Sequence, residues 1–198
     1  MQASLEKQIT GVILAGGRGR RMGDVDKGLR AFRGYALVEW AIERLKPQVA
    51  EILINANQNQ DRYGVYGYKV ISDLIPDYAG PLAGLHSALS SASHELVLTA
   101  PCDSPFLPTD LAQRLHAALR SASADVAVAR TGAQPHPVFC LVRRTLLSHL
   151  SDFLQQGGRK IDAWYADLQS IEVAFDDQPE AFVNFNTLAE LSAAEKKS

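Results

Sequence analysis

Cysteines are scarce in this sequence and long hydrophobic runs are missing, and both shortages exclude classes of protein. The two cysteines, Cys102 and Cys140, are too few for the disulfide framework of a small secreted domain. No apolar stretch approaches the roughly 20 residues of a membrane-spanning helix. The first residues also lack the apolar centre of a signal peptide. We therefore expect a cytoplasmic protein that has no membrane as a partner.

Charge of one sign is not in excess either. The formal net charge is −2, from 20 Lys and Arg residues against 22 Asp and Glu residues. A nucleic-acid-binding domain would carry a basic surplus, so we expect no nucleic acid partner. The hydrophobic share of 46% and the charged share of 21% are those of an ordinary globular protein. At 198 residues, a single domain is expected over residues 1–198.

A stretch rich in glycine and arginine, close to the N-terminus, is the most informative part of the sequence. The apolar residues 12–15 predict a buried strand that ends at Gly16 and Gly17, and several arginines and Lys27 follow. The dinucleotide fingerprint is excluded because Met22 stands where it needs a small residue, and the P-loop is excluded because glycine follows Lys27. Glycines with surplus positive charge suit a polyphosphate. The alternative is a basic surface loop in contact only with solvent.

Strands and helices alternate along the first half of the chain. The hydrophobic pattern predicts strands at residues 10–15, 51–55, 69–71, 95–100, 125–129, 137–142 and 171–175, and a short one at 182–183. It predicts helices at residues 37–45, 82–89, 108–119 (with Thr109 as N-cap), 146–154, 161–168 and 188–194. This order indicates an α/β fold of three layers, a mostly parallel twisted sheet with helices on both faces.

Polar motifs follow several of these strands at the point where each strand ends. Gly16, Asp73 and Asp103 lie just past the carboxyl end of a predicted strand, and Asn55 is the last residue of one. In open α/β sheets, ligands bind at that edge. The sequence therefore predicts a ligand site there, with a nucleotide-binding half at about 1–105 and an acceptor-binding half at about 106–198.

The motifs also carry a resemblance to a known family. The sequence LAGGRGRRMG from Leu14, followed by Asp26, Lys27 and Gly28, resembles the L-A-G-G-x-x-x-R-M-G-x-x-K signature of nucleotidyltransferases. Within them it is most similar to the molybdenum cofactor guanylyltransferases. The resemblance continues through NAN at 55–57, GPLAG at 80–84, PCD at 101–103 and NFNT at 184–187, so it covers nearly the whole chain. Residues 34–37 depart from the pattern, with Gly-Tyr-Ala-Leu in place of Gly-Lys/Arg-Pro-Leu.

The resemblance implies a Rossmann-like nucleotidyltransferase fold and a specific reaction. GMP would be transferred from GTP to the phosphate of molybdenum-molybdopterin, with Mg²⁺ as cofactor and pyrophosphate as leaving group. The acceptor phosphate is already mostly dianionic at neutral pH, so no general base is needed. Proteins that mature molybdoenzymes are candidate partners. The alternatives are a molybdopterin cytidylyltransferase, another small-molecule nucleotidyltransferase, or a non-catalytic nucleotide-binding module.

Catalytic and metal-binding roles follow from the same resemblance. Lys27 would clamp the phosphates with help from Arg21, since a lysine can follow charge that builds on a leaving pyrophosphate. Asp103 would hold Mg²⁺, which prefers carboxylate, phosphate and water oxygens, and Asn186 would be a second ligand. Asp103 has the alternative of bonding its own turn, and Asn186 that of capping the last helix. Cys102 is interpreted as a small buried residue and not as a nucleophile.

Further roles in substrate binding are implied for both halves. Guanine offers two N–H groups to an acidic or amide side chain, and its O6 accepts from backbone N–H groups. The residues expected to bind GTP are Leu14, Ala15, Gly16, Gly17, Lys27, Asn55, Asp73 and Asp103. His136, Arg159 and Lys160 are expected to bind the acceptor. For Arg159 and Lys160, a solvated helix start is the alternative.

Overall fold

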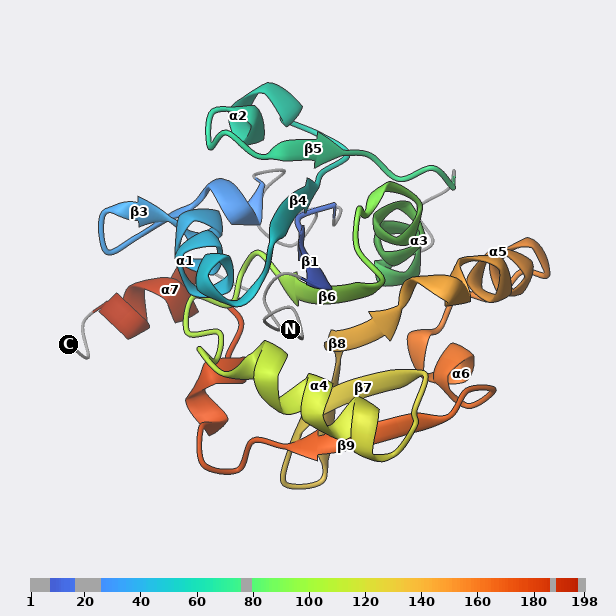
Figure 1. Ribbon diagram of the computed structural model, residues 1–198. Coiled ribbons are helices and arrows are strands. Elements are labelled where there is room, and N and C mark those ends of the chain that lie inside the picture. The colour runs from blue at the N-terminus through green and yellow to red at the C-terminus, as the bar shows by residue number, and fades with distance from the viewer. Residues whose placement is uncertain (1–7, 17–25, 76–79, 186–187, 196–198) are drawn as a thin grey trace.

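The centre of the protein is a sheet of seven strands in the order β5-β4-β1-β6-β8-β7-β9. The computed structural model describes residues 8–16, 26–75, 80–185 and 188–195. In Figure 1 the strands follow one another from β5 to β9 down the picture. Their bounds are β1 (Ile9–Leu14), β4 (Glu51–Asn55), β5 (Lys69–Ile71), β6 (Leu96–Pro101), β7 (Val126–Thr131), β8 (Gln134–Arg143) and β9 (Ser170–Ala174).

The strand directions bring several strand ends to one edge. β1 pairs in parallel with both β4 and β6, and β4 pairs in parallel with β5. Leu14 lies opposite Asn55 on one side and Pro101 on the other, so the carboxyl ends of three strands are level. β8 is antiparallel to β6 and to β7, which places the start of β8 at that same edge. The prediction of a mostly parallel sheet is confirmed.

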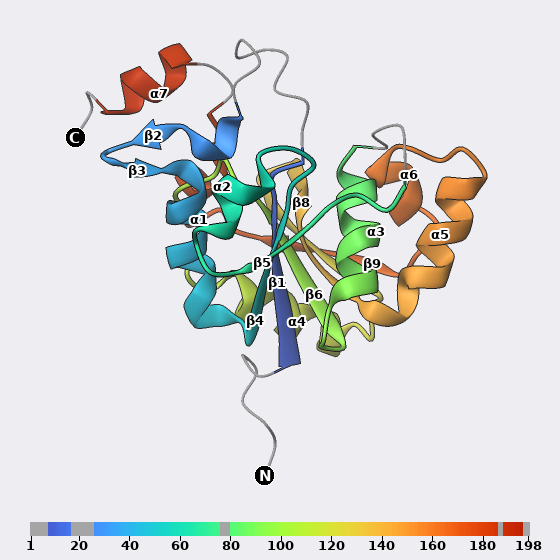
Figure 2. The ribbon, with the colours of Figure 1, turned by 90° about the horizontal axis from the view of Figure 1, so that it is seen from above.

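Helices cover both faces because side chains alternate along each strand. Ile13 belongs to a core cluster with α1 (Leu37–Leu45) and α4 (Leu111–Ser121). Val12 belongs to a second cluster with α3 (Pro81–Ser91), α5 (Leu147–Gln155) and α6 (Ile161–Tyr165). Figure 2 shows α1 on one side of the sheet and α3 with α5 on the other. Together with the sheet, these helices make the predicted three layers.

The C-terminal segment packs beside the first part of the chain. A small hairpin of β2 (Ala31–Phe32) and β3 (Tyr35–Ala36) precedes α1. Phe32 and Leu37 share a third cluster with Phe185 and with Leu191 of α7 (Leu188–Glu195). Figure 2 shows α7 beside this hairpin. None of the helices in the described part of the chain is long and apolar enough to cross a membrane.

Three sequence predictions about elements are wrong, and one of them is the helix predicted at 161–168, which ends at Tyr165. The helix predicted at 108–119 begins at Leu111, and Thr109 does not cap it. Gln48 caps it instead, since its side chain accepts from Ala112 N at 2.9 Å and donates to Pro108 O at 2.8 Å. Residues 182–183 form no strand, because Phe182 is the last residue of the 3-10 helix η6 (Pro179–Phe182) and Val183 is its C-cap.

Candidate active site

The segments after β1, β4 and β6 are joined by backbone hydrogen bonds at the carboxyl edge of the sheet. Ala15 N donates to Asn55 O at 2.8 Å, and Cys102 N donates to Leu14 O at 3.1 Å. Three predicted positions, Leu14, Ala15 and Asn55, therefore lie together, and the chain continues from them to Gly16. Gly17 and Arg21, which were also predicted to act here, lie outside the described residues.

Asp73 ties two asparagines together at this edge. Its Oδ1 accepts from Asn55 Nδ2 at 2.9 Å, and its Oδ2 accepts from Asn57 Nδ2 at 2.7 Å. Asn57 makes a second hydrogen bond to Asp73, because its Oδ1 accepts from Asp73 N at 2.9 Å. Its Nδ2 also donates to Gly16 O at 3.2 Å. The structure thus brings together Gly16, Asn55 and Asp73 as predicted. It adds Asn57, whose place in the NAN motif was the available signal.

Two glycines leave room for the Asn55 side chain, which is only 2% exposed. A Cβ atom on Gly84, in α3, would lie 2.6 Å from Asn55 Oδ1, and one on Gly16 would lie 3.0 Å from it. Any side chain at residue 84 would therefore push Asn55 out of its place. The glycine in the GPLAG motif is explained by this close approach.

Lys27 and Asp103 form an ion pair between two segments distant in sequence. Lys27 begins the 3-10 turn η3 (Lys27–Leu29), and Asp103 follows β6. Lys27 Nζ lies 3.3 Å from Asp103 Oδ2, with the two side chains 26% and 11% exposed. Phe185 N donates to Asp103 O at 3.3 Å, which brings the C-terminal segment to the same place. Asn186, the predicted second metal ligand, lies outside the described residues.

The single carboxylate of Asp103 fits one common kind of magnesium site. Mg²⁺ often takes one or two protein carboxylates and completes its shell with water and substrate phosphates. Among the described residues, no group of three or more His, Cys, Asp or Glu side chains could hold a metal ion. A metal at Asp103 would therefore depend on the phosphates of a bound nucleotide.

Cys102 is not suited to act as a nucleophile. The thiol is buried, and burial together with the nearby Asp103 carboxylate raises its pKa well above the usual value. A thiolate is the reactive form, so this cysteine stays inert. The interpretation of Cys102 as a small buried residue agrees with this.

The predicted acceptor residues have separate surroundings. His136 lies near the start of β8, where its Nε2 is 2.8 Å from Thr131 Oγ1 and its ring stacks on Phe182 at 4.5 Å. Burial lowers the pKa of His136. Arg159 Nη1 donates to Leu154 O at 2.9 Å and to Gly158 O at 2.7 Å, so it closes the end of α5. Lys160 is exposed just before α6.

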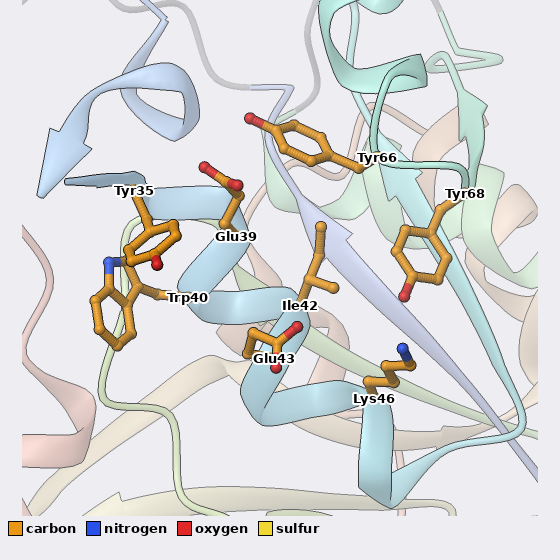
Figure 3. A pocket seen from close by; sticks show the side chains of 8 residues that line it. All are labelled: Tyr35, Glu39, Trp40, Ile42, Glu43, Lys46, Tyr66 and Tyr68. Atoms are coloured by element: carbon orange, nitrogen blue, oxygen red, sulfur yellow. The ribbon is translucent and has the colours of Figure 1, made fainter.

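A hollow of about 500 Å³ lies elsewhere, on the outer side of α1. Figure 3 shows aromatic and acidic side chains around it, from the hairpin, α1 and the segment after α2 (Gln60–Gly64). Its lining residues are Tyr35, Glu39, Trp40, Ile42, Glu43, Lys46, Tyr66 and Tyr68. None of the predicted site residues is among them, so this hollow does not enlarge the candidate site.

Known proteins resemble this chain over most of its length. A family model described as MobA-like NTP transferase domain matches residues 11–170. A molybdenum cofactor guanylyltransferase of Ralstonia nicotianae is 53% identical over 192 residues, which cover 92% of this chain and 94% of that protein. One of Shewanella halifaxensis is 51% identical over 180 residues, with 91% and 90% covered.

A solved structure supports the assignment of the fold. The crystal structure of molybdopterin-guanine dinucleotide biosynthesis protein A from Archaeoglobus fulgidus matches with a TM-score of 0.77. Sequence identity is 24%, and the match covers 95% of this chain and 97% of that one. At this identity the likeness shows that the two chains share a fold.

Proposed function

Because this chain belongs to the MobA-like NTP transferase family, we propose that it transfers GMP from GTP to the phosphate of molybdenum-molybdopterin. The names of relatives that share about half of its residues support this reaction. The structural observation that carries the proposal is the polar edge of the sheet. There the Lys27–Asp103 pair and the Asn55–Asp73 cluster flank the end of β1.

The reaction would proceed by in-line attack of the acceptor phosphate. A new bond forms between an acceptor oxygen and the α-phosphorus of GTP. The bond between the α-phosphorus and the oxygen that bridges it to the β-phosphorus breaks, and pyrophosphate leaves with that oxygen. The acceptor is a phosphate monoester with a second pKa of about 6, so it attacks without a general base. The protein is left to position the substrates and to balance charge.

Lys27 is proposed to balance the charge on the leaving pyrophosphate, with Arg21 assisting. Its position next to Asp103 supports this role, because the carboxylate keeps the ammonium at the edge where the phosphates would lie. Asp103 is proposed to hold Mg²⁺, with Asn186 as the second ligand. When bound, that ion would neutralise phosphate oxygens.

The guanine ring is proposed to bind near the Asn55–Asn57–Asp73 cluster and the backbone of residues 14–17. Asp73 receives an amide N–H from each asparagine, so all three side chains are held in fixed orientations. A fixed acceptor favours a base whose N–H groups meet it and rejects one without them. Cytosine does not present the N1–H and N2–H₂ groups of guanine.

The test offers GTP, CTP, ATP and UTP to the enzyme, with and without molybdopterin, and measures pyrophosphate and the dinucleotide product. We expect GTP to be preferred by roughly tenfold to a hundredfold per mismatched contact, which corresponds to about 1–3 kcal/mol. A dominant cytosine dinucleotide at equal concentrations would replace the proposal with the cytidylyl alternative. Nucleotide binding without any pyrophosphate release would favour a non-catalytic binding module.

The acceptor is proposed to bind at the part of the edge that the second half of the chain forms, near His136, Arg159 and Lys160. The place of His136 at the start of β8 supports this, because antiparallel β8 begins at the carboxyl edge of β6. The two cations before α6 offer charge for the pterin phosphate. Molybdoenzyme-maturation proteins, which would receive the product, are proposed as partners.

A further inference from the structure

Hydrogen bonds to the Asp26 side chain hold the turn that carries Lys27. Gly28 N donates to Asp26 Oδ1 at 3.2 Å, and Asn59 Nδ2 donates to Asp26 Oδ2 at 3.2 Å. The hydroxyl of Tyr63 donates to Asp26 Oδ1 as well. Tyr63 belongs to α2 and is fully buried, although 37 positions separate it from Asp26.

Close packing around Gly28 holds the backbone on the other side of Lys27. A Cβ atom at residue 28 would lie 2.5 Å from Tyr63 Oη and 3.1 Å from Cys102 Sγ. The backbone next to Lys27 is therefore packed between a tyrosine hydroxyl and a buried thiol. Tyr63 therefore contacts both chain neighbours of Lys27, Asp26 and Gly28, and holds them in place.

The turn needs such support because it is short. The 3-10 turn η3 has three residues, and its backbone bonds are Leu29 N to Asp26 O at 3.3 Å and Arg30 N to Lys27 O at 3.1 Å. Short 3-10 pieces have poor hydrogen-bond geometry and little stability of their own. The orientation of the Lys27 side chain therefore depends on contacts made by its neighbours.

The charge of Asp26 gives its hydrogen bonds a second consequence. A carboxylate one residue before Lys27 would otherwise compete with Asp103 for the ammonium group. Three donors already occupy the Asp26 oxygens, and the Lys27 ammonium lies 3.3 Å from Asp103. Burial raises the pKa of Tyr63, so its hydroxyl keeps the proton that it donates.

We propose that Tyr63 and Asp26 are positioning residues that hold Lys27 beside Asp103 for the transfer reaction. This inference rests on the proposed function, because it presumes that Lys27 acts on the nucleotide phosphates. The rival interpretation is that Tyr63 and Asp26 only stabilise the fold. The two differ in whether the effect of Tyr63 passes through Lys27.

The first measurement compares Tyr63→Phe with Tyr66→Phe in steady-state GMP transfer from GTP to molybdopterin. Tyr63→Phe keeps the buried ring and removes the hydroxyl, and we expect kcat to fall roughly ten- to a hundredfold, the effect of a misplaced catalytic group. Tyr66 lines the hollow on α1, so Tyr66→Phe is the matched control with wild-type turnover. Wild-type turnover in folded Tyr63→Phe would overturn the inference.

The second measurement repeats Tyr63→Phe in a Lys27→Ala background. Lys27→Ala alone is expected to lower turnover about a hundredfold, as for loss of one preorganised electrostatic contact. Tyr63→Phe should then cause no further loss, because the group that it positions is gone. A second, multiplicative loss would mean that Tyr63 acts on the fold alone and would overturn the inference. If Lys27→Ala itself has normal turnover, the proposed function of Lys27 fails instead.

Thermal unfolding of each variant separates folding from positioning. If Tyr63→Phe does not fold, Asp26→Asn replaces it in the same cycle, since the amide keeps an acceptor for Gly28 N and loses the charge. We expect Asp26→Asn to lower turnover in the wild-type background and to have no effect beside Lys27→Ala. Equal losses in both backgrounds would overturn the inference.

Discussion

At the scale of single residues, the Asp103 carboxylate is a nearly buried charge that is paired with one cation. Its side chain is only 11% exposed, and its oxygen faces the Lys27 ammonium at 3.3 Å. Burying a charge is costly unless an opposite charge is near, so each member of this pair depends on the other. A substitution that removes one charge therefore changes the electrostatics of the whole edge.

Asp103→Asn is predicted to lower Mg²⁺-dependent GMP transfer at least about a hundredfold, because the amide keeps the size of the side chain but loses its charge. Transfer measured across a magnesium titration checks this, with circular dichroism to confirm the fold. Asp152→Asn, on the exposed part of α5, is the control and should match wild type. An unchanged magnesium dependence in Asp103→Asn would show that the ion is held elsewhere.

The residues that sequence alone could predict are those with a local signal. Lys27, Asn55, Asp73 and Asp103 each stand in a motif at the end of a strand, directly after a strand or after a glycine loop. Tyr63 had no such signal, because its contact with Asp26 joins segments 37 positions apart. Only the folded chain brings such residues together.

At the scale of elements, α3 packs so closely on β4 that one of its residues must be glycine. Gly84→Ala is predicted to raise the KM for GTP about tenfold, because its Cβ would displace Asn55 Oδ1 from a distance of 2.6 Å. Alanine favours a helix over glycine by about 1 kcal/mol, so the helix itself is not weakened. Steady-state kinetics with GTP measure this change.

The control for this substitution is Gly64→Ala at the end of α2, where a Cβ atom would meet nothing within 4 Å. It should leave the KM for GTP unchanged. If Gly84→Ala also has a wild-type KM, the Asn55 side chain does not contribute to nucleotide binding.

The segment between α5 and α6 carries the proposed acceptor cations, and the structure separates their roles. Replacing Arg159 and Lys160 together by glutamine is predicted to raise the KM for molybdopterin several-fold and to leave that for GTP unchanged. Arg159→Gln alone should also lower the melting temperature, because Arg159 donates to two carbonyl groups at this end. Lys160→Gln should not. Equal changes in both KM values would count against a separate acceptor site.

Elements with strong periodicity were predictable, and short ones were not. The helix at residues 37–45 repeats apolar residues every four positions, and its predicted bounds are those observed. The two-residue strands β2 and β3 carry no period that a pattern could reveal. The start of α4 depends on Gln48, which is distant in sequence, so no local rule could give it.

At the scale of the whole molecule, Glu51 joins three segments at the edge of the sheet opposite the candidate site. Its Oε2 accepts from Thr10 Oγ1 at 2.6 Å and from Ser93 N at 2.9 Å, and its Oε1 accepts from Ser93 Oγ at 2.9 Å. Burial alone would raise the pKa of Glu51, but these hydrogen bonds and the nearby His94 bring it below its ordinary value of 4.5.

A lowered pKa in the folded state fixes the sign of the pH dependence. The stabilisation by Glu51 is complete above its unfolded pKa and is lost as the pH falls through the folded pKa. Glu51→Gln is therefore predicted to have a lower melting temperature than wild type at pH 7, with the difference shrinking as the pH falls below the ordinary pKa of 4.5. Exposed Glu95→Gln is the control and should follow wild type. A constant difference at every pH would show that the Glu51 charge is not involved.

The class of the fold was predictable from the alternation of strands and helices, but the strand order was not. β8 lies between β6 and β7 and runs against both, and that choice depends on pairings such as Thr99 with Cys140. Such pairings are decided by contacts between distant segments, which a local pattern does not contain. The division into two functional halves stays a prediction.

The cluster of Phe32, Leu37, Phe185 and Leu191 has a consequence for biosynthesis. A ribosome makes the Lys27 turn and the hairpin early, yet two residues of the cluster, Phe185 and Leu191, are made more than 140 positions later. The nascent polypeptide therefore cannot complete this cluster until Phe185 and Leu191 have left the exit tunnel. We expect ribosome-bound chains to be inactive and to gain transferase activity only when a linker long enough to free α7 is added behind it.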